Sequence, residues 1–196
     1  MLSRMDAVRV SALRQSLAGT GWPERAGAFA AALRGSVTRR SATGLLLVGT
    51  PRYEPWHLAA HLSDEAAYSG VPELVPTLLR HTVPPGAPSH LACGLPRLEE
   101  ARNGATVLLV APAPADAPLL ERLDGARRAG AVLLALDDGD PELTALAHER
   151  LTVPEAEPEP FELVQHLVSS ATSTVPPRSR LARLVERLTA SPVVRW

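Results

Sequence analysis

The chain has 196 residues, 45% of them hydrophobic and 21% charged, and 20 basic residues against 21 acidic ones leave a net charge of −1. This length predicts one domain with a sizeable core, and the near-neutral charge argues against a nucleic-acid binder or a protein held on an anionic membrane. All basic residues are arginine, there is no isoleucine, and Asn103 is the only asparagine, which indicates a GC-rich genome.

Several classes of protein are excluded by single features. Cys93 is the only cysteine, so an intramolecular disulfide and a cysteine-rich zinc site are ruled out. No apolar run reaches the roughly 18 residues of a membrane span, and residues 1–10 lack the apolar stretch of a secretory signal. We therefore expect a cytoplasmic protein that has no membrane partner.

The hydrophobic pattern alternates between helical and strand-like segments along the chain. Short continuous apolar runs predict buried strands, and spacings of three and four residues predict amphipathic helices. The expected elements are helices at 5–17 and 23–35, a strand at 45–48, a helix at 54–68, a strand at 106–111, a helix at 116–130, a strand at 131–136, a helix at 140–147, a strand at 151–153, and helices at 161–170 and 178–188. The segment 71–79 stays ambiguous, because Pro72 and Pro76 interrupt it.

Alternating strands and helices predict a three-layer α/β/α sandwich with a parallel, flavodoxin-like sheet of four or five strands. We expect this α/β domain over residues 44–173. Residues 1–43 are expected to form helices that pack on the core. Residues 174–196 are expected to form a basic amphipathic helix, which would pack either on its own domain or on a partner subunit.

The order of these segments resembles the SIS (sugar isomerase) domain family over residues 44–171. In that family a strand ends in a glycine loop, as at 45–50, and a second strand leads into a loop at the start of a helix, as at 105–116. A helix ending in Arg-Arg-Ala-Gly-Ala, as at 127–131, then precedes a strand with a small acidic turn, as at 134–138. The resemblance implies a sugar-phosphate site at these loops and a tendency to dimerise through helices.

The loops depart from the family pattern where phosphate is normally held by hydroxyls and backbone N–H groups. Residues 112–117 contain no Ser, Thr or Gly, and the prolines in this loop have no N–H to donate. Asp116, the expected N-cap of the following helix, would repel a phosphate there. The turn at 137–140 adds three aspartates, so we expect a locally acidic edge with Arg52 as the main exception.

Candidate ligand-binding residues follow three strands of the predicted sheet. In parallel α/β folds these loops meet at the carboxyl edge of the sheet, where ligands bind. The candidates are Thr50, Arg52, Tyr53, Ala115, Asp116, Asp137 and Asp138. The alternative interpretation is a surface loop with solvated turns, in which Asp140 serves as the N-cap of a helix.

Candidate catalytic residues lie on the helix predicted at 54–68. His57, His61 and Glu65 share one helical face with Asp64. The phosphoheptose isomerase branch carries a histidine near the position of His57, and its glutamate would fall near His61. A metal-binding or acid–base role is one interpretation, and a polar outer face of a surface helix is the other. Because the order differs from a His-Glu-x-x-His zinc helix, we assign no metal and expect no cofactor.

We expect a non-catalytic or regulatory SIS-like domain that binds a sugar-like metabolite or a protein partner and forms a homo-oligomer. One alternative is a sugar-phosphate isomerase. It would use Thr50, Arg52, His57, His61 and Glu65. The other alternative is a structural homo-oligomeric interaction protein, whose arginine-rich C-terminal helix docks elsewhere.

Overall fold

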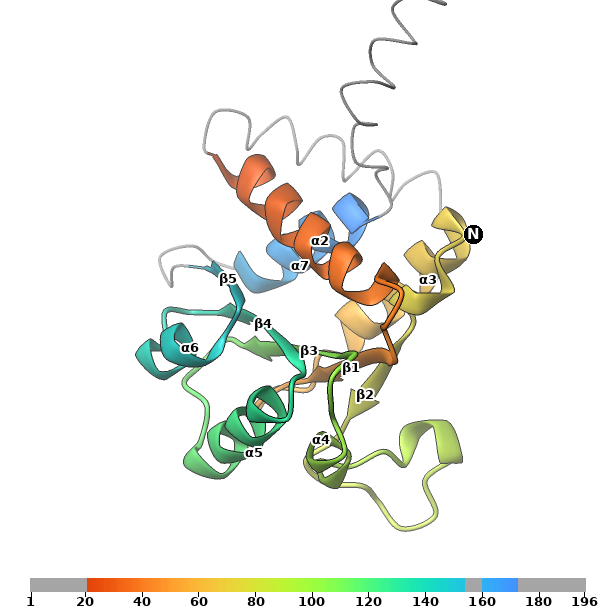
Figure 1. Ribbon diagram of the computed structural model, residues 1–196, viewed down its shortest axis with the longest axis vertical. Coiled ribbons are helices and arrows are strands. Elements are labelled where there is room, and N and C mark those ends of the chain that lie inside the picture. The colour runs from red at the N-terminus through yellow and green to blue at the C-terminus, as the bar shows by residue number, and fades with distance from the viewer. Residues whose placement is uncertain (1–20, 154–159, 173–196) are drawn as a thin grey trace, which may run out of the picture.

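The computed structural model describes residues 21–153 and 160–172 (Figure 1). Within them, five parallel strands form one sheet in the order β2-β1-β3-β4-β5. The strands are β1 (Gly44–Val48), β2 (Pro76–Leu79), β3 (Ala105–Ala111), β4 (Val132–Asp137) and β5 (Glu149–Thr152). This arrangement confirms the predicted sandwich with a flavodoxin-like sheet.

Helices cover both faces of the sheet (Figure 1). The helices are α2 (Trp22–Thr38), α3 (Trp56–Ser69), α4 (Pro96–Glu99), α5 (Ala117–Arg128), α6 (Pro141–Leu146) and α7 (Pro160–Thr172), with short 3-10 turns η1 (Pro72–Leu74) and η2 (Ser89–Leu91). The helices α2, α3 and α7 pack over one face, and α4, α5 and α6 pack over the other.

Each face of the sheet has its own apolar core, because neighbouring side chains on a strand point to opposite faces. On β1, Leu45 and Leu47 face the layer of α2, α3 and α7, whereas Leu46 and Val48 face the layer of α4 and α5. All residues of β3 are buried. The strands therefore read as continuous apolar runs in the sequence rather than as alternating ones.

The ambiguous segment 71–79 resolves into η1 followed by β2. Among the described strands, β2 forms one edge of the sheet and pairs with β1 alone. Pro76 is its first residue, a position where the missing N–H disturbs little of the ladder. Pro72 opens the 3-10 turn η1. The prolines that obscured the sequence pattern thus mark the start of each short element.

Aspartates begin two helices of the same layer, as the sequence predicts. The Asp116 carboxylate accepts a hydrogen bond from the Leu119 N–H (3.3 Å) at the start of α5. The Asp140 carboxylate accepts one from the Glu142 N–H (2.9 Å) at the start of α6. These caps hold the two loops that lead into α5 and α6 at the carboxyl edge of the sheet.

The helix predicted at 23–35 is α2, which packs on α7 beside β5. The helices predicted at 5–17 and 178–188 lie outside the described residues, and the proposed boundaries at 43/44 and 173/174 stay predictions. None of the described helices is long and apolar enough to cross a membrane.

Candidate functional site

The strand order reverses between β1 and β3, and ligands of open α/β sheets bind at such a reversal, outside the carboxyl ends of the strands. Residues 49–55, 112–116 and 138–140 connect the strands to α3, α5 and α6 at this edge. The Asp138 N–H donates to the Ala111 carbonyl (3.2 Å), which joins the end of β3 to the loop after β4. The candidate ligand residues therefore share one edge of the sheet.

The loop after β1 is a tight turn. The Tyr53 N–H donates to the Thr50 carbonyl (3.0 Å), and Thr50 is only 3% exposed. A Cβ on Gly49 would lie 1.8 Å from the Tyr53 carbonyl oxygen, so this backbone approach requires glycine. Arg52 is exposed at the tip of the turn. Of the first-loop candidates, Arg52 is thus the side chain most open to a ligand.

Tyr53 is directed toward α7. Its hydroxyl accepts a hydrogen bond from the Gln165 amide (2.8 Å), and Gln165 is buried. Burial raises the pKa of the Tyr53 phenol above its ordinary 10.0; the Gln165 hydrogen bond opposes this rise, and the charge of Glu162 adds to it. Tyr53 therefore ties the first loop to α7.

Arg80 and His81 follow β2 and reach the same loop, which the sequence analysis missed. Arg80 Nε lies 3.2 Å from a Glu54 carboxylate oxygen, and the Trp56 indole N–H donates to that oxygen (2.9 Å). The His81 ring lies 2.9 Å from the Gly49 carbonyl oxygen. The available signal was their position directly after the strand β2. That strand was not predicted, because Pro72 and Pro76 interrupt its hydrophobic pattern.

Asp140 links the loops that precede α5 and α6. One carboxylate oxygen accepts from the Ala115 N–H (3.0 Å) and the other from the Glu142 N–H (2.9 Å), and Asp140 is 4% exposed. Asp116 takes the Leu119 N–H. The N–H of the loop residue before the N-cap and one N–H of the first turn of α5 are therefore bound by carboxylates of the protein itself.

Arg150 on β5 corrects the expectation of an acidic edge relieved mainly by Arg52. Its Nε and Nη2 donate to the two carboxylate oxygens of Asp137, each at 2.6 Å, and the Asp137 side chain is fully buried. Arg150 also donates to the Asp140 carbonyl, and the Gly139 N–H donates to Asp137. The hydrogen bond to Asp137 raises the pKa of Arg150. Asp137, a predicted ligand residue, is therefore one partner of an internal ion pair.

Arg150 was overlooked because the predicted strand at 151–153 begins one residue after it. In the structure, β5 begins at Glu149, and Arg150 pairs in register with Ala135 of β4. The available signal was a basic residue inside a strand whose neighbouring strand ends in an aspartate.

Two of the catalytic candidates of α3, His57 and His61, lie beside His166 of α7, and the His57 side chain is also 60% exposed. The ring centroids of His57 and His61 lie 5.2 Å apart, and that of His166 on α7 lies 4.3 Å from His61. Glu65 is only 7% exposed. Glu162 lies one turn before His166 and contacts His57 through its carboxylate (2.5 Å).

His166 and Glu162 were not singled out by the sequence analysis. They lie four residues apart on one predicted helix, the same spacing that drew attention to His57 and His61. Sequence alone did not show that these two helical faces meet.

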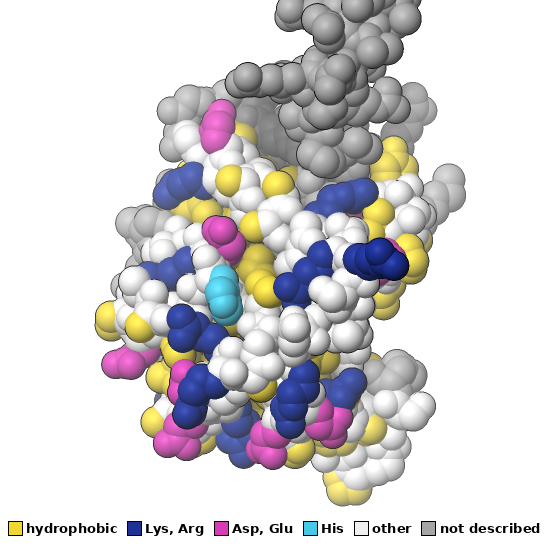
Figure 2. Space-filling view, in the orientation of Figure 1, with side chains coloured by type: hydrophobic (Ala, Val, Ile, Leu, Met, Phe, Trp, Pro, Cys, Tyr) yellow, Lys and Arg dark blue, Asp and Glu magenta, His cyan; other side chains and the backbone are white. Residues whose placement is uncertain are grey.

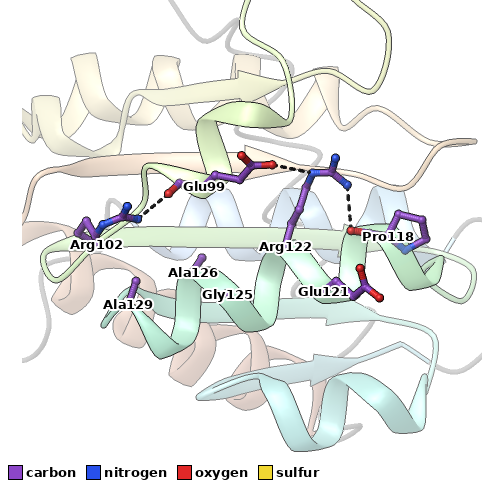
Figure 3. Close-up of a pocket in the computed structure, with 8 residues that line it drawn as sticks. All are labelled: Glu99, Arg102, Pro118, Glu121, Arg122, Gly125, Ala126 and Ala129. Atoms are coloured by element: carbon purple, nitrogen blue, oxygen red, sulfur yellow. Dashed lines mark hydrogen bonds and ion pairs between the residues drawn. The ribbon is translucent and has the colours of Figure 1, made fainter.

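A groove of about 540 Å³ lies between α4 and α5 (Figure 3). Its lining consists of Glu99, Arg102, Pro118, Glu121, Arg122, Gly125, Ala126 and Ala129. Arg122 contacts the Glu99 carboxylate (3.4 Å) and donates to the Pro118 carbonyl. Arginine and acidic side chains intermingle over this end of the molecule in Figure 2. None of the predicted ligand residues lines the groove, and two of its charged side chains, Arg122 and Glu99, form an ion pair.

The fold and the loop arrangement define an open parallel α/β/α sandwich with its candidate site at the carboxyl edge of the sheet. No family model matches the chain, and no curated protein matches it. Among solved structures, it is similar to the sugar isomerase domain of the RpiR transcription factor from Sphaerobacter thermophilus, with 20% identity, a TM-score of 0.52, and coverage of 81% of this chain and 86% of that one.

It is also similar to a putative phosphosugar isomerase from Silicibacter pomeroyi DSS-3, with 17% identity and a TM-score of 0.50. That match covers 87% of this chain and 50% of the other, so this chain spans half the length of that protein. The chain has the fold of a SIS domain, as its segment order predicts. At these identities the likeness describes the fold alone.

Proposed function

We propose that this chain is a non-catalytic, regulatory SIS-like domain that binds an unphosphorylated sugar-like metabolite at the carboxyl edge of its sheet. The observation that carries the proposal is the Asp140 carboxylate, which accepts the Ala115 N–H at 3.0 Å. The start of a helix attracts anions because its N–H groups point outward without intrahelical partners. Here the Asp116 carboxylate takes one of these donors, the Leu119 N–H, and the Asp140 carboxylate takes the Ala115 N–H in the loop just before the helix.

A phosphate at this position would have to displace Asp140 or lie beside its negative charge. Like charges in contact repel, and the repulsion grows when one of them is buried, as Asp140 is. A neutral sugar meets no such barrier, because its hydroxyls both donate to carboxylates and accept from a guanidinium. Arg52 and Asp138 lie on the loops of this edge and suit that chemistry.

The isomerase alternative requires a base within hydrogen-bonding reach of the substrate. Glu65 is buried, and His57 and His61 contact α7 residues. These contacts favour the non-catalytic function, and an assay for aldose–ketose interconversion of hexose 6-phosphates tests the alternative directly. Turnover that is lost in Glu65→Gln would overturn our proposal.

Thermal unfolding with matched ligands tests the proposed binding. The panel contains free hexoses and N-acetylhexosamines, their 6-phosphates, and inorganic phosphate. We expect at least one free sugar to stabilise the protein by more than about 1 kcal/mol near saturation, and its 6-phosphate to stabilise it less. Stabilisation by the phosphates alone contradicts the proposal. If no sugar of either kind stabilises the protein, the protein-partner alternative replaces it.

The variant Asp140→Ala tests whether the internal carboxylate is what excludes phosphate. Loss of the cap lowers stability by about 1 kcal/mol, and release of the Ala115 N–H should allow hexose 6-phosphates to stabilise the variant. Glu142→Ala is the matched control, because it removes an exposed charge from the first turn of α6 and leaves Asp140 in place. Equal ligand responses in the two variants would refute the role given to Asp140.

A further inference from the structure

Three histidines from two helices converge at the contact between α3 and α7. His57 and His61 lie on successive turns of α3, and His166 comes from α7. Their ring centroids are 5.2, 5.6 and 4.3 Å apart, and one nitrogen from each ring lies within 4.8 Å of the other two. No residue of the carboxyl-edge site belongs to this cluster.

We propose that His57, His61 and His166 form a binding site for one divalent transition-metal ion. Neutral imidazole is a preferred ligand of zinc, copper, nickel and cobalt, and the absence of thiolates and the presence of three ring nitrogens fit that class of ion. Such a site would connect α3 to α7 through the metal and thereby fix the position of α7 on the sheet.

The observed spacing lies within a small adjustment of metal geometry. Zinc binds histidine nitrogen at about 2.0–2.1 Å, which places two nitrogens of a tetrahedral site roughly 3.3 Å apart. The ligand atoms lie within 4.8 Å of one another, so side-chain movements on the order of 1 Å bring the nitrogens to the separation that zinc requires. The His57 side chain is 60% exposed and has the room to rotate.

Glu162 supplies the outer partner that histidine ligands of metals usually have. Its carboxylate lies 2.5 Å from Nδ1 of His57, which leaves Nε2 of that ring to bind the ion. A carboxylate in this place fixes the orientation of the imidazole and makes the ring a stronger ligand. Glu162 and His166 occupy successive turns of α7, so one helix provides both a ligand and the outer partner.

The helical setting makes the ligand arrangement rigid. The i, i+4 spacing on α3 places His57 and His61 on one face, and the two helices pack through a shared apolar core that includes Leu58, Leu62 and Val164. Sites carried by packed helices hold their ligands more accurately than sites on loops. Three protein nitrogens leave the fourth tetrahedral position to water, on the side where His57 meets solvent.

Metal titration of the full chain tests the proposal, with any affinity tag removed and with bound metal first stripped by a chelator. We expect calorimetry with Zn²⁺ to give one ion per chain, and Co²⁺ to produce the visible absorption of a tetrahedral nitrogen site. His61→Gln and His166→Gln should abolish both signals. Glu162→Gln should weaken Zn²⁺ binding by about 10–100-fold, as the loss of an outer partner usually does.

His148→Gln is the control, because this exposed histidine belongs to the connection between α6 and β5 and should leave the titration unchanged. Far-UV circular dichroism of the metal-free proteins shows whether each variant folds. If the variants at His61 and His166 unfold, Zn²⁺ titration of His57→Gln tests the site instead, because this residue is exposed. Zn²⁺ binding should be weaker in that variant than in the wild type. The proposal is overturned if the wild type takes up no ion, or if folded variants of the cluster bind Zn²⁺ as tightly as the wild type.

Discussion

At the scale of single residues, the contact between Arg150 and Asp137 holds the end of β4 to the neighbouring strand β5. Both oxygens of the buried Asp137 carboxylate accept from the guanidinium. Removal of one partner leaves a buried charge without compensation, which costs several kcal/mol in proteins. The carboxyl edge of the sheet therefore depends on an arginine that no ligand needs to touch.

We predict that Arg150→Ala lowers the free energy of unfolding by about 3 kcal/mol, the low end of the range for broken buried pairs, because the Arg150 side chain is 21% exposed. Urea denaturation measures the change. The control is Arg128→Ala, which breaks an exposed pair with Asp124 and should cost no more than about 0.5 kcal/mol. Similar losses in the two variants would contradict the structural role of Arg150.

Tyr53 gives a prediction about alkaline pH. Burial raises the pKa of its phenol in the folded protein, so the folded state keeps this proton at a pH where the unfolded chain releases it. Stability from this group is complete below pH 10.0 and declines as the pH rises through the unfolded value toward the folded one.

The chain has two tyrosines, Tyr53 and Tyr68, so Tyr68→Phe makes phenolate absorbance report Tyr53 alone. We expect its titration midpoint to lie above that of the same variant unfolded in guanidinium chloride. Coincident midpoints would show that the contact with Gln165 and α7 does not bury the phenol in solution. The double variant with Tyr53→Phe provides the blank.

At the scale of elements, the turn between β1 and α3 sets the course of the first loop. A Cβ on Gly49 would meet the Tyr53 carbonyl at 1.8 Å, and that neighbour is backbone, which cannot turn aside. We expect Gly49→Ala to lower the free energy of unfolding by more than about 3 kcal/mol or to prevent folding, as large steric changes in packed sites do.

Gly125→Ala is the matched control for the change at Gly49. Gly125 lies inside α5, and a Cβ there has nothing within 4 Å. Alanine favours a helix over glycine, so this variant should gain about 0.5–1 kcal/mol. Thermal unfolding of the two variants should move in opposite directions. Tolerance of alanine at position 49 would mean that the loop opens readily.

The short elements show where reasoning from the sequence is weakest. Long apolar or periodic segments such as β3 and α5 were predicted within two residues of their observed ends, because burial on a sheet or a helix face leaves a strong pattern. The strand β2 and the helix α4, each four residues long, leave too short a pattern to be read. Their structure depends on the neighbours that cover them.

At the scale of the whole molecule, one sheet supports two separate cores. Leu108 and Leu109 are neighbours on β3, both fully buried, but they face opposite helical layers. We predict that Leu108→Ala and Leu109→Ala each cost about 2–5 kcal/mol and that unfolding stays a single transition. Coincident urea curves from circular dichroism and tryptophan fluorescence would confirm this. A second transition in either variant would show that the two layers unfold independently.

The sequence by itself determined the sandwich, its parallel strands and the two aspartate caps. These features follow from local pattern, since apolar runs, helical spacing and capping residues act through near neighbours along the chain. It also placed candidate residues on three loops that share an edge of the sheet.

Only the tertiary structure decided which groups satisfy one another. Asp140 reaches the Ala115 N–H, Arg150 neutralises Asp137, and His166 joins the histidines of α3 through contacts between segments far apart in the sequence. Pairings of this kind depend on how layers and loops come together in space. The sequence could name the charged and ligating residues at each position, but the folded chain alone determines their partners.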